Sequence, residues 1–335
     1  MQVMAATIFI VIILLFCFYS CPSSSSSSSP MMNNWKRIVG GEHVSIDVVP
    51  WQALIQQHLS LSDDTTTTTI QCGAVLIDPM WILSASHCIQ QPWYRYPIDV
   101  YFGLTNITAT IIRQSTIRSV KRVFDPAKYD PQLSGDLILL QLNESIIIGE
   151  TIQPIYLPES DENFDYHIGT VSGYGSTLFQ KTFKPANILH MIQVPILPTS
   201  SCIELYKKAF KDGATTTNVA MEFIRNKKLI CAGYKQGGYD ACIGDSGGPL
   251  AVCVDDWMMT MAMKRSISMN RLLLTRLYPI ERQPQQQRQR QCNGKWKLAG
   301  IISIGYRCAE PSIPGLYIDI TVYANWIRSI IHSST

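Results

Sequence analysis

The chain has 335 residues, enough for about two domains of ordinary size. Hydrophobic residues make up 46% and charged residues 16%, the latter below the roughly 25% of an average globular protein, which excludes a wholly disordered chain, a coiled coil or a collagen-like polymer. The net charge of +3 is too small to indicate nucleic acid as a partner. The ten cysteines indicate either an oxidising compartment or a bound metal, because cytosolic proteins rarely keep disulfides.

An apolar stretch from Val3 to Tyr19 opens the chain, and seven consecutive serines, Ser23 to Ser29, follow it. A hydrophobic core followed by small residues is typical of a cleaved secretory signal peptide, which we place at residues 1–20. An uncleaved membrane anchor is the alternative, since no Lys or Arg precedes the stretch and its length approaches that of a membrane-spanning helix. Both interpretations place the rest of the chain outside the cytosol.

Short apolar stretches broken by Gly, Pro, Asn and Thr follow residue 38, and none is long enough to span a bilayer. They predict β-strands, most clearly at 73–77, 81–85, 136–142, 192–197 and 297–303. Apolar residues recur at helical spacing near the C-terminus and predict one short helix there: Tyr323, Trp326, Ile327, Ile330 and Ile331. The pattern favours an all-β sandwich or barrel that ends in a helix.

A serine lies among glycines in the segment Gly244-Asp245-Ser246-Gly247-Gly248-Pro249-Leu250. A serine in such a setting is usually part of a turn. A nucleophilic serine, however, needs an adjacent base and backbone N–H groups that stabilise the oxyanion of its intermediate. Glycines suit that second need, because they carry no side chain to block the amides.

The candidate base is His87, which follows an apolar stretch and precedes Cys88. The candidate for orienting it is Asp136, which directly precedes the apolar stretch Leu137 to Leu140. A lone histidine is more often a core or surface residue, and an acid before a strand is more often a cap. A buried carboxylate can, however, accept the ring N–H of a histidine and fix its tautomer.

The order His87, Asp136, Ser246 resembles that of the trypsin/chymotrypsin-like serine peptidases. Three further segments match the family in the same order: Arg37-Ile38-Val39-Gly40-Gly41, Ser172-Gly173-Tyr174-Gly175 and Gly300-Ile301-Ile302-Ser303-Ile304-Gly305. The resemblance runs from Ile38 to the C-terminus and is interrupted at 254–291. It implies an all-β fold of two six-stranded antiparallel β-barrels with a C-terminal helix, in a peptidase domain at 38–335.

The resemblance also implies a secreted serine endopeptidase that works through an acyl-enzyme. Ser246 would attack the scissile carbonyl, His87 would move the proton, and Asp136 would orient His87. The backbone N–H groups of Gly244 and Ser246 would form the oxyanion hole. A non-catalytic binding protein with the same fold is the alternative.

Asp240 occupies the position at which trypsin-like members of the family carry the acid of the primary substrate pocket. A carboxylate there would pair with an Arg or Lys before the scissile bond. Gly305 and Gly315 match pocket-wall glycines, and Ser303 lies on the substrate-binding strand. Two residues depart from the family pattern near this pocket, Ile304 and Arg307. By the resemblance, Arg307 would lie at the lip of the pocket, where it would narrow the entry or repel basic substrate side chains.

Cleavage after Arg37 would remove the propeptide, residues 21–37, and activate a zymogen. By resemblance, the freed ammonium group of Ile38 would pair with Asp245. Two other substitutions relative to the family are Ser86 for the usual alanine beside the histidine, and Tyr174 for a tryptophan.

The resemblance implies three disulfides, Cys72–Cys88, Cys202–Cys231 and Cys242–Cys308. The two remaining cysteines, Cys253 and Cys292, bracket the segment 254–291 and could pair with each other. Zinc is the alternative use of the cysteines, but the chain contains no Cys-x-x-Cys pair. Asn106 and Asn143 begin glycosylation motifs.

The segment 254–291 is rich in Met, then in Gln and Arg, where relatives have a short hairpin. A disordered insertion, a basic exosite for polyanions and a translated intron all remain open for it. The expected partners are peptide or protein substrates and serpin-type inhibitors, besides a polyanion at this segment, and we expect a monomer that binds no nucleic acid. We expect no cofactor and no metal, because no carboxylate between Asp99 and Ser115 could form the calcium loop of some relatives.

Overall fold

The computed structural model describes residues 39–60, 67–108, 116–176, 186–209, 222, 224, 226, 228–254, 292–303 and 308–334. The predicted signal peptide (1–20), the predicted propeptide (21–37) and all but the first residue of the segment 254–291 lie outside these ranges. Within the described ranges, no helix is both long and apolar enough to cross a membrane.

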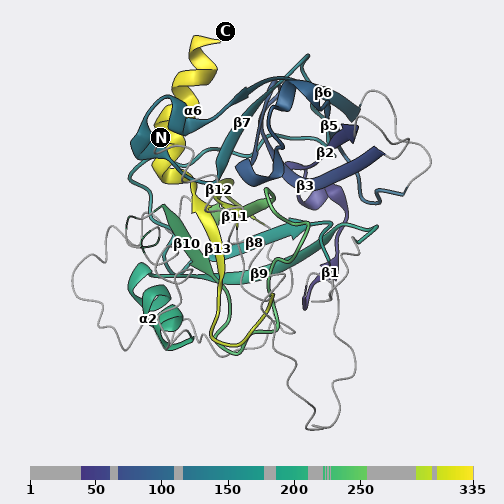
Figure 1. Cartoon of the computed structure of the whole chain (residues 1–335). Helices are drawn as coiled ribbons and strands as arrows, with labels where there is room; N and C mark the ends of the chain where they lie inside the picture. Colours follow the sequence, from purple (N-terminus) through teal and green to yellow (C-terminus); the bar gives the residue numbers. More distant parts are fainter. Residues whose placement is uncertain are drawn as a thin grey trace.

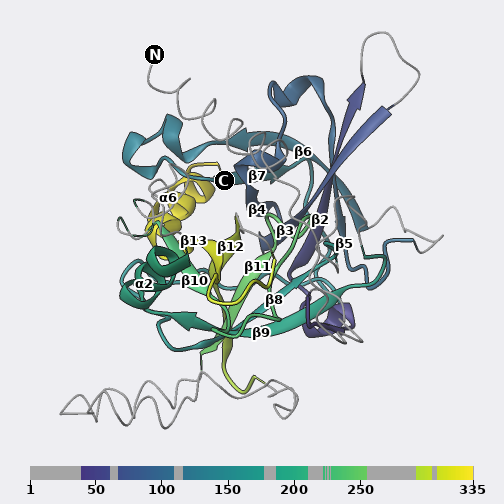
Figure 2. The same cartoon turned by 60° about the horizontal axis from the view of Figure 1, so that its bottom comes forward.

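The first half of the chain (Figure 1) forms a closed barrel of six antiparallel strands in the order β2-β3-β4-β7-β6-β5, all of which are labelled in Figure 2. Its strands are β2 (Gln52–Ser60), β3 (Thr67–Asp78), β4 (Trp81–Ala85), β5 (Ile98–Phe102), β6 (Ile117–Phe124) and β7 (Leu137–Leu142). In β5, Ile98, Val100 and Phe102 are buried and the residues between them are half-buried. This alternation places one face of the strand inside the barrel.

The second half forms another closed barrel, in which β8 pairs with both β9 and β11. Its strands are β8 (Ile168–Gly173), β9 (His190–Leu197), β10 (Leu229–Ala232), β11 (Pro249–Val254), β12 (Lys295–Ile302) and β13 (Gly315–Asp319). The two-residue strand β1 (Glu42–His43) pairs with β9 outside this ring. The two rings confirm the all-β fold of two six-stranded barrels that the family resemblance implies.

Two strands of the first barrel, β4 and β7, are buried along their whole length. Their inward residues, such as Ile82 and Leu140, belong to the core of the barrel. Their outward residues, such as Leu83 and Leu139, pack in a separate core with the C-terminal helix and with strands of the second barrel. Both faces are therefore apolar, which explains why these segments are continuous hydrophobic runs in the sequence.

The C-terminal helix α6 (Ile320–Ser333) is confirmed and lies beside the first barrel in both views (Figures 1 and 2). Asp319 caps its N-terminus by accepting a hydrogen bond from the Thr321 amide at 3.0 Å. Four of the five residues that predict the helix are buried and one, Ile331, is partly buried: Tyr323, Trp326, Ile327, Ile330 and Ile331. The helix thus contributes to the core that lies between the two barrels.

The remaining described helices are short. One α-helix, α2 (Thr199–Ala209), precedes β10, and the 3-10 helices are η1 (Ile46–Val48), η2 (Ser86–Cys88), η3 (Trp93–Arg95), η5 (Pro126–Lys128) and η6 (Pro131–Leu133).

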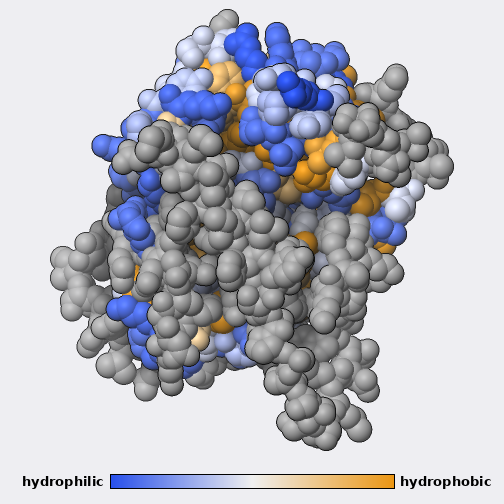
Figure 3. Space-filling model, in the orientation of Figure 1, coloured by the Kyte–Doolittle hydropathy of each residue, from blue (hydrophilic) through white to orange (hydrophobic). Residues whose placement is uncertain are grey.

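The face in Figure 3 is mainly hydrophilic over the upper barrel, with hydrophobic patches between the polar side chains. Asp136, Asp240 and Ser246 lie between the helices and strands, whereas His87 lies in η2.

Candidate active site

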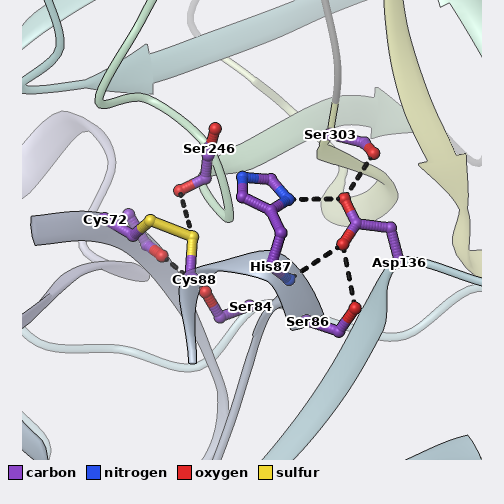
Figure 4. Close-up of polar contacts among 9 residues, drawn as sticks. Cys72, Ser84, Ser86, His87, Cys88, Asp136, Ser246 and Ser303 are labelled. Atoms are coloured by element: carbon purple, nitrogen blue, oxygen red, sulfur yellow. Dashed lines mark hydrogen bonds and ion pairs between the residues drawn. A yellow bond between two sulfur atoms is a disulfide. The ribbon is translucent and has the colours of Figure 1, made fainter. Parts of the chain in front are cut away.

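The three residues of the predicted triad come from both barrels and meet in one place (Figure 4). His87 lies in η2, directly after β4, and Asp136 directly precedes β7, the strand that pairs with β4. The Ser86 amide donates to the Asp136 carbonyl at 2.7 Å, so the two segments are joined where the strands end. Ser246 lies just before β11 of the second barrel.

His87 lies between the other two residues, with Asp136 on one side of its ring and Ser246 on the other (Figure 4). The Nδ1 atom of His87 is 2.8 Å from Oδ2 of Asp136. No dashed line joins the Ser246 hydroxyl to the ring. Hydrogen bonds of this kind often form fully only when substrate binds.

The carboxylate of Asp136 carries its charge in a site with little water. Burial alone favours its neutral form, but the attraction of His87 and hydrogen bonds from His87 and Ser303 prevail and hold the pKa of Asp136 below its ordinary value. Burial also lowers the proton affinity of His87, yet the adjacent Asp136 outweighs this and raises the pKa of His87. The pair therefore favours a carboxylate next to a histidine that readily accepts a proton.

Two serines that the motifs did not assign to this pair also donate to Asp136. Ser303, predicted as a substrate-binding residue, donates its hydroxyl to Oδ2 at 2.6 Å. Ser86 donates its hydroxyl to Oδ1 at 2.9 Å. They are 167 and 50 residues from Asp136 in the chain, so spacing alone could not pair them; only the unusual serine beside the histidine was a signal.

The turn around Ser246 requires glycine at two positions. Gly244 has a φ of 93° and Gly247 a φ of 82°, in the left-handed region that residues with side chains rarely adopt. A Cβ on Gly247 would also lie 2.2 Å from Oγ of Ser84 and 2.3 Å from the Gly73 carbonyl oxygen. Within the described residues, the amides of Gly244 and Ser246 donate to no protein acceptor.

Ser246 is also fixed to the opposite barrel. The Gly73 amide donates to the Ser246 carbonyl at 2.8 Å, and the Ser84 hydroxyl donates to the Gly73 carbonyl at 2.8 Å. The disulfide Cys72–Cys88 lies beside these contacts (Figure 4). Strands β3 and β4 thus hold both the serine and the histidine.

Asp240 and Asp245 are both buried near Ser246. Asp240 accepts a hydrogen bond from the Ala309 amide at 3.1 Å, and a Cβ on Gly315 would lie 2.6 Å from its Oδ1. Burial raises the pKa of Asp240 to about 7. The structure thus places Asp240 and Gly315 side by side, as the predicted pocket requires, whereas Gly305, Ile304 and Arg307 lie outside the described residues.

Asp245 accepts hydrogen bonds from the amides of Gly175 at 2.7 Å and Cys242 at 2.9 Å. Burial raises its pKa to about 6. The start of the described chain approaches this region, because Val39 forms a β-bridge with Asp240. Arg37 and Ile38 lie outside the described residues.

The eight cysteines of the predicted peptidase domain form four disulfides: Cys72–Cys88, Cys202–Cys231, Cys242–Cys308 and Cys253–Cys292. Within the described ranges, one group has the composition of a metal site: Cys72, His87 and Cys88. Both of its sulfur atoms belong to a disulfide, so neither is available as a thiolate ligand.

Tyr174 is buried where the family has a tryptophan, and its hydroxyl donates to the Leu104 carbonyl. The segment Gln90–Pro97, which follows His87, contains η3, with Tyr94 exposed and Trp93 partly buried against the core of the first barrel. The glycosylation candidate Asn143 is exposed, and the side-chain oxygen of Asn106 accepts a hydrogen bond from the Thr108 hydroxyl at 2.8 Å.

The chain folds into two antiparallel β-barrels, and a histidine–aspartate pair faces a serine where the barrels meet. This combination defines the class of trypsin-like serine peptidases. A family model described as Trypsin matches residues 38–258 and 290–327, so the chain belongs to this family. Among curated proteins, the chain is 30% identical over 296 residues to "Serine protease filzig" of Drosophila melanogaster. The aligned region is 88% of this chain but only 14% of the length of that relative.

Proposed function

We propose that the protein is a serine endopeptidase that cleaves after Arg or Lys, with Ser246 as nucleophile, His87 as general base and Asp136 as the residue that orients His87. The observation that carries the proposal is the 2.8 Å contact between Nδ1 of His87 and Oδ2 of Asp136, with Ser246 across the ring. An ionised Asp136 fixes the tautomer in which Nε2 of His87 can accept the Ser246 proton.

In the reaction, Oγ of Ser246 forms a bond to the substrate carbonyl carbon while its proton passes to Nε2 of His87. The resulting oxyanion lies beside the amides of Gly244 and Ser246, which have no other described acceptor. His87 then gives the proton to the leaving amine as the peptide bond breaks. Water reverses the sequence and releases the acyl group from Ser246.

The direct test of this assignment is Ser246→Ala. The variant should lose measurable hydrolysis of a small arginine ester while its thermal unfolding stays close to that of the parent chain. Turnover equal to that of the parent would overturn the assignment. A parent chain that binds peptides without hydrolysing them would favour a non-catalytic binding protein instead.

The preference for Arg or Lys rests on Asp240. Its carboxylate is buried, and a cationic side chain from the substrate would relieve the cost of ionising it there. We therefore expect Asp240→Ser to lose most of its activity on arginine peptides and to gain in relative activity on phenylalanine peptides. A variant that keeps the parent preference for arginine would refute this part of the proposal.

The burial of Asp245 without a cationic partner among the described residues supports the proposal that the chain is made as a zymogen. Cleavage at Arg37–Ile38 would supply an ammonium group close to Val39, which already lies against Asp240. Arg37→Gln should remain inactive after treatment with trypsin, whereas the parent chain should gain activity. Full activity of the uncleaved chain would contradict the zymogen proposal.

The secreted location and the glycans belong to the same proposal and rest on the apolar start of the sequence and on the exposed Asn143. Expression in a eukaryotic secretory host should yield protein in the medium that loses mass on treatment with an N-glycosidase. Retention of all the protein in the membrane fraction would favour the uncleaved anchor.

A further inference from the structure

The carboxylate of Asp136 accepts four hydrogen bonds, two at each oxygen. At Oδ2 the donors are His87 Nδ1 and the Ser303 hydroxyl, at 2.8 and 2.6 Å. At Oδ1 they are the His87 amide and the Ser86 hydroxyl, at 3.0 and 2.9 Å. The Ser86 hydroxyl has no part in the proton transfers proposed above.

We propose that Ser86 is a positioning residue that fixes the Asp136 carboxylate and reduces the basicity of His87. This inference rests on the proposed function, because it concerns the same histidine and aspartate. It assigns no contact with the substrate to Ser86.

The positioning follows from the geometry. Ser86 and Asp136 are joined twice, through the Ser86 amide to the Asp136 carbonyl at 2.7 Å and through the hydroxyl to Oδ1. Without the hydroxyl, only the His87 amide would hold Oδ1. Since rotation of the carboxylate would move Oδ2 away from Nδ1 of His87, a second donor at Oδ1 favours the orientation that the histidine needs.

The effect on basicity follows from the charge. A carboxylate that donates electron density into an additional hydrogen bond attracts a nearby cation less strongly. The proton on His87 is therefore held less tightly with the Ser86 hydroxyl than without it. Among the described residues, the other titratable group that interacts with Asp136 is Tyr323 of α6, whose pKa is raised mainly by burial, so it stays neutral while His87 titrates.

The experiment compares the full chain with Ser86→Ala by NMR titration of histidines labelled at the ring, and by kcat/KM for an arginine ester as a function of pH after activation. In the variant, the His87 amide and the Ser303 hydroxyl still hold one carboxylate oxygen each, so Asp136 stays next to His87 and the charge effect decides the direction of the shift. The His87 midpoint should therefore move to higher pH. The ratio of kcat/KM at pH 6 to that at pH 8.5 should fall roughly twofold to fivefold, because a fivefold change in the protonation equilibrium of His87 corresponds to about 1 kcal/mol, the net contribution of a typical hydrogen bond.

Ser119→Ala is the matched control, because the Ser119 hydroxyl also donates to a carboxylate, Oδ1 of Asp99 at 3.0 Å, and that carboxylate pairs with His58 instead of His87. It should leave the His87 midpoint unchanged. An unchanged midpoint in Ser86→Ala, or an equal shift in Ser119→Ala, would overturn the inference. If the parent chain hydrolyses nothing, the proposed function fails, yet the NMR midpoint still decides the role of Ser86.

Discussion

Asp240 and Asp245 are buried carboxylates five residues apart in the chain, and neither has a cationic partner among the described residues. Burial raises their pKa values to about 7 and about 6, and backbone amides only partly offset it. Each carboxylate therefore gains from a cation that arrives later. In the proposed function, these cations are the substrate side chain for Asp240 and the new N-terminus for Asp245.

The raised pKa of Asp240 has a consequence for stability. Between its ordinary value of 3.8 and about 7, the folded chain retains a proton that the unfolded chain has released. The free energy of unfolding contributed by Asp240 therefore falls as pH rises through this range. Asp240→Asn should remove this loss. Relative to the parent chain, the variant should gain about 2–4 kcal/mol more in free energy of unfolding at pH 8 than at pH 4.

Denaturant unfolding at the two pH values measures this difference directly. Asp161→Asn, a substitution of an exposed carboxylate, serves as the control and should change stability equally at both. An equal effect of Asp240→Asn at pH 4 and pH 8 would contradict the assignment of a raised pKa to this residue.

The loop after His87 is held by a buried glutamine of β2, Gln57. The side chain of Gln57 donates through Nε2 to the carbonyls of Gln90 and Tyr96, both at 3.2 Å, and its Oε1 accepts from the Gln90 amide at 2.6 Å. One side chain thus ties both ends of the segment that carries η3. The exposed Tyr94 is presented by a loop with fixed ends.

Replacement of this glutamine should loosen the loop. Gln57→Leu leaves one amide and two carbonyls without partners and should lower the free energy of unfolding by about 2–3 kcal/mol. Limited digestion with trypsin should then cut faster after Arg95, which is exposed in η3. The measurement is the rate of that cut in inactive Ser246→Ala backgrounds.

Gln56→Leu is the control for this substitution, because Gln56 is the neighbouring residue of β2 and makes one side-chain contact, with Gln71 at 3.3 Å. It should change the rate of the cut after Arg95 much less. Equal rates in the two variants would mean that Gln57 does not hold the loop.

The elements that the sequence predicts are those with a clear apolar pattern. β4 has the predicted bounds, β7 begins one residue after the predicted start, and α6 contains all five residues that indicated it. The helix α2 was not predicted, because only Cys202 and Tyr206 of its eleven residues are buried. Two buried positions do not produce a recognisable helical period.

The sequence likewise predicts some features of the candidate site and misses others. Motifs place His87, Asp136 and Ser246, since each lies in a short segment with a characteristic composition. The contacts of Ser303, Ser86 and Gln57 join residues 33 to 167 positions apart. Such pairs depend on how the strands and barrels assemble, so no local sequence pattern predicts them.

At the scale of the whole molecule, the site depends on contacts that cross between the barrels. Ser303 of the second barrel donates to Asp136 of the first, and Gly73 of the first donates to Ser246 of the second. Away from the triad, the Ser172 hydroxyl donates to Oε1 of the buried Gln52 at 2.7 Å. The triad is therefore a property of the assembled pair of barrels.

The disulfide Cys253–Cys292 closes the ends of the segment 254–291, with a sequence separation of 39. In the chain-entropy account, closing a loop of this length contributes about 4 kcal/mol. Replacement of both cysteines by serine should lower the free energy of unfolding by about 2–4 kcal/mol, measured by denaturant titration.

The same double variant should keep its hydrolytic activity, because β11 and β12 remain paired through six registered residue pairs from Pro249 to Val254. Loss of activity without loss of stability would show that the disulfide acts on the site itself.

We propose that Ser246 is the nucleophile of a working peptidase, and covalent labelling tests this role most directly. The activated chain is treated with a serine-directed organophosphate, and the modified residue is located by peptide mapping and mass spectrometry. We predict one label per molecule, on Ser246, with none on Ser246→Ala and strongly reduced labelling of His87→Ala. A parent chain that takes up no label, or takes it up on another serine, would contradict the account.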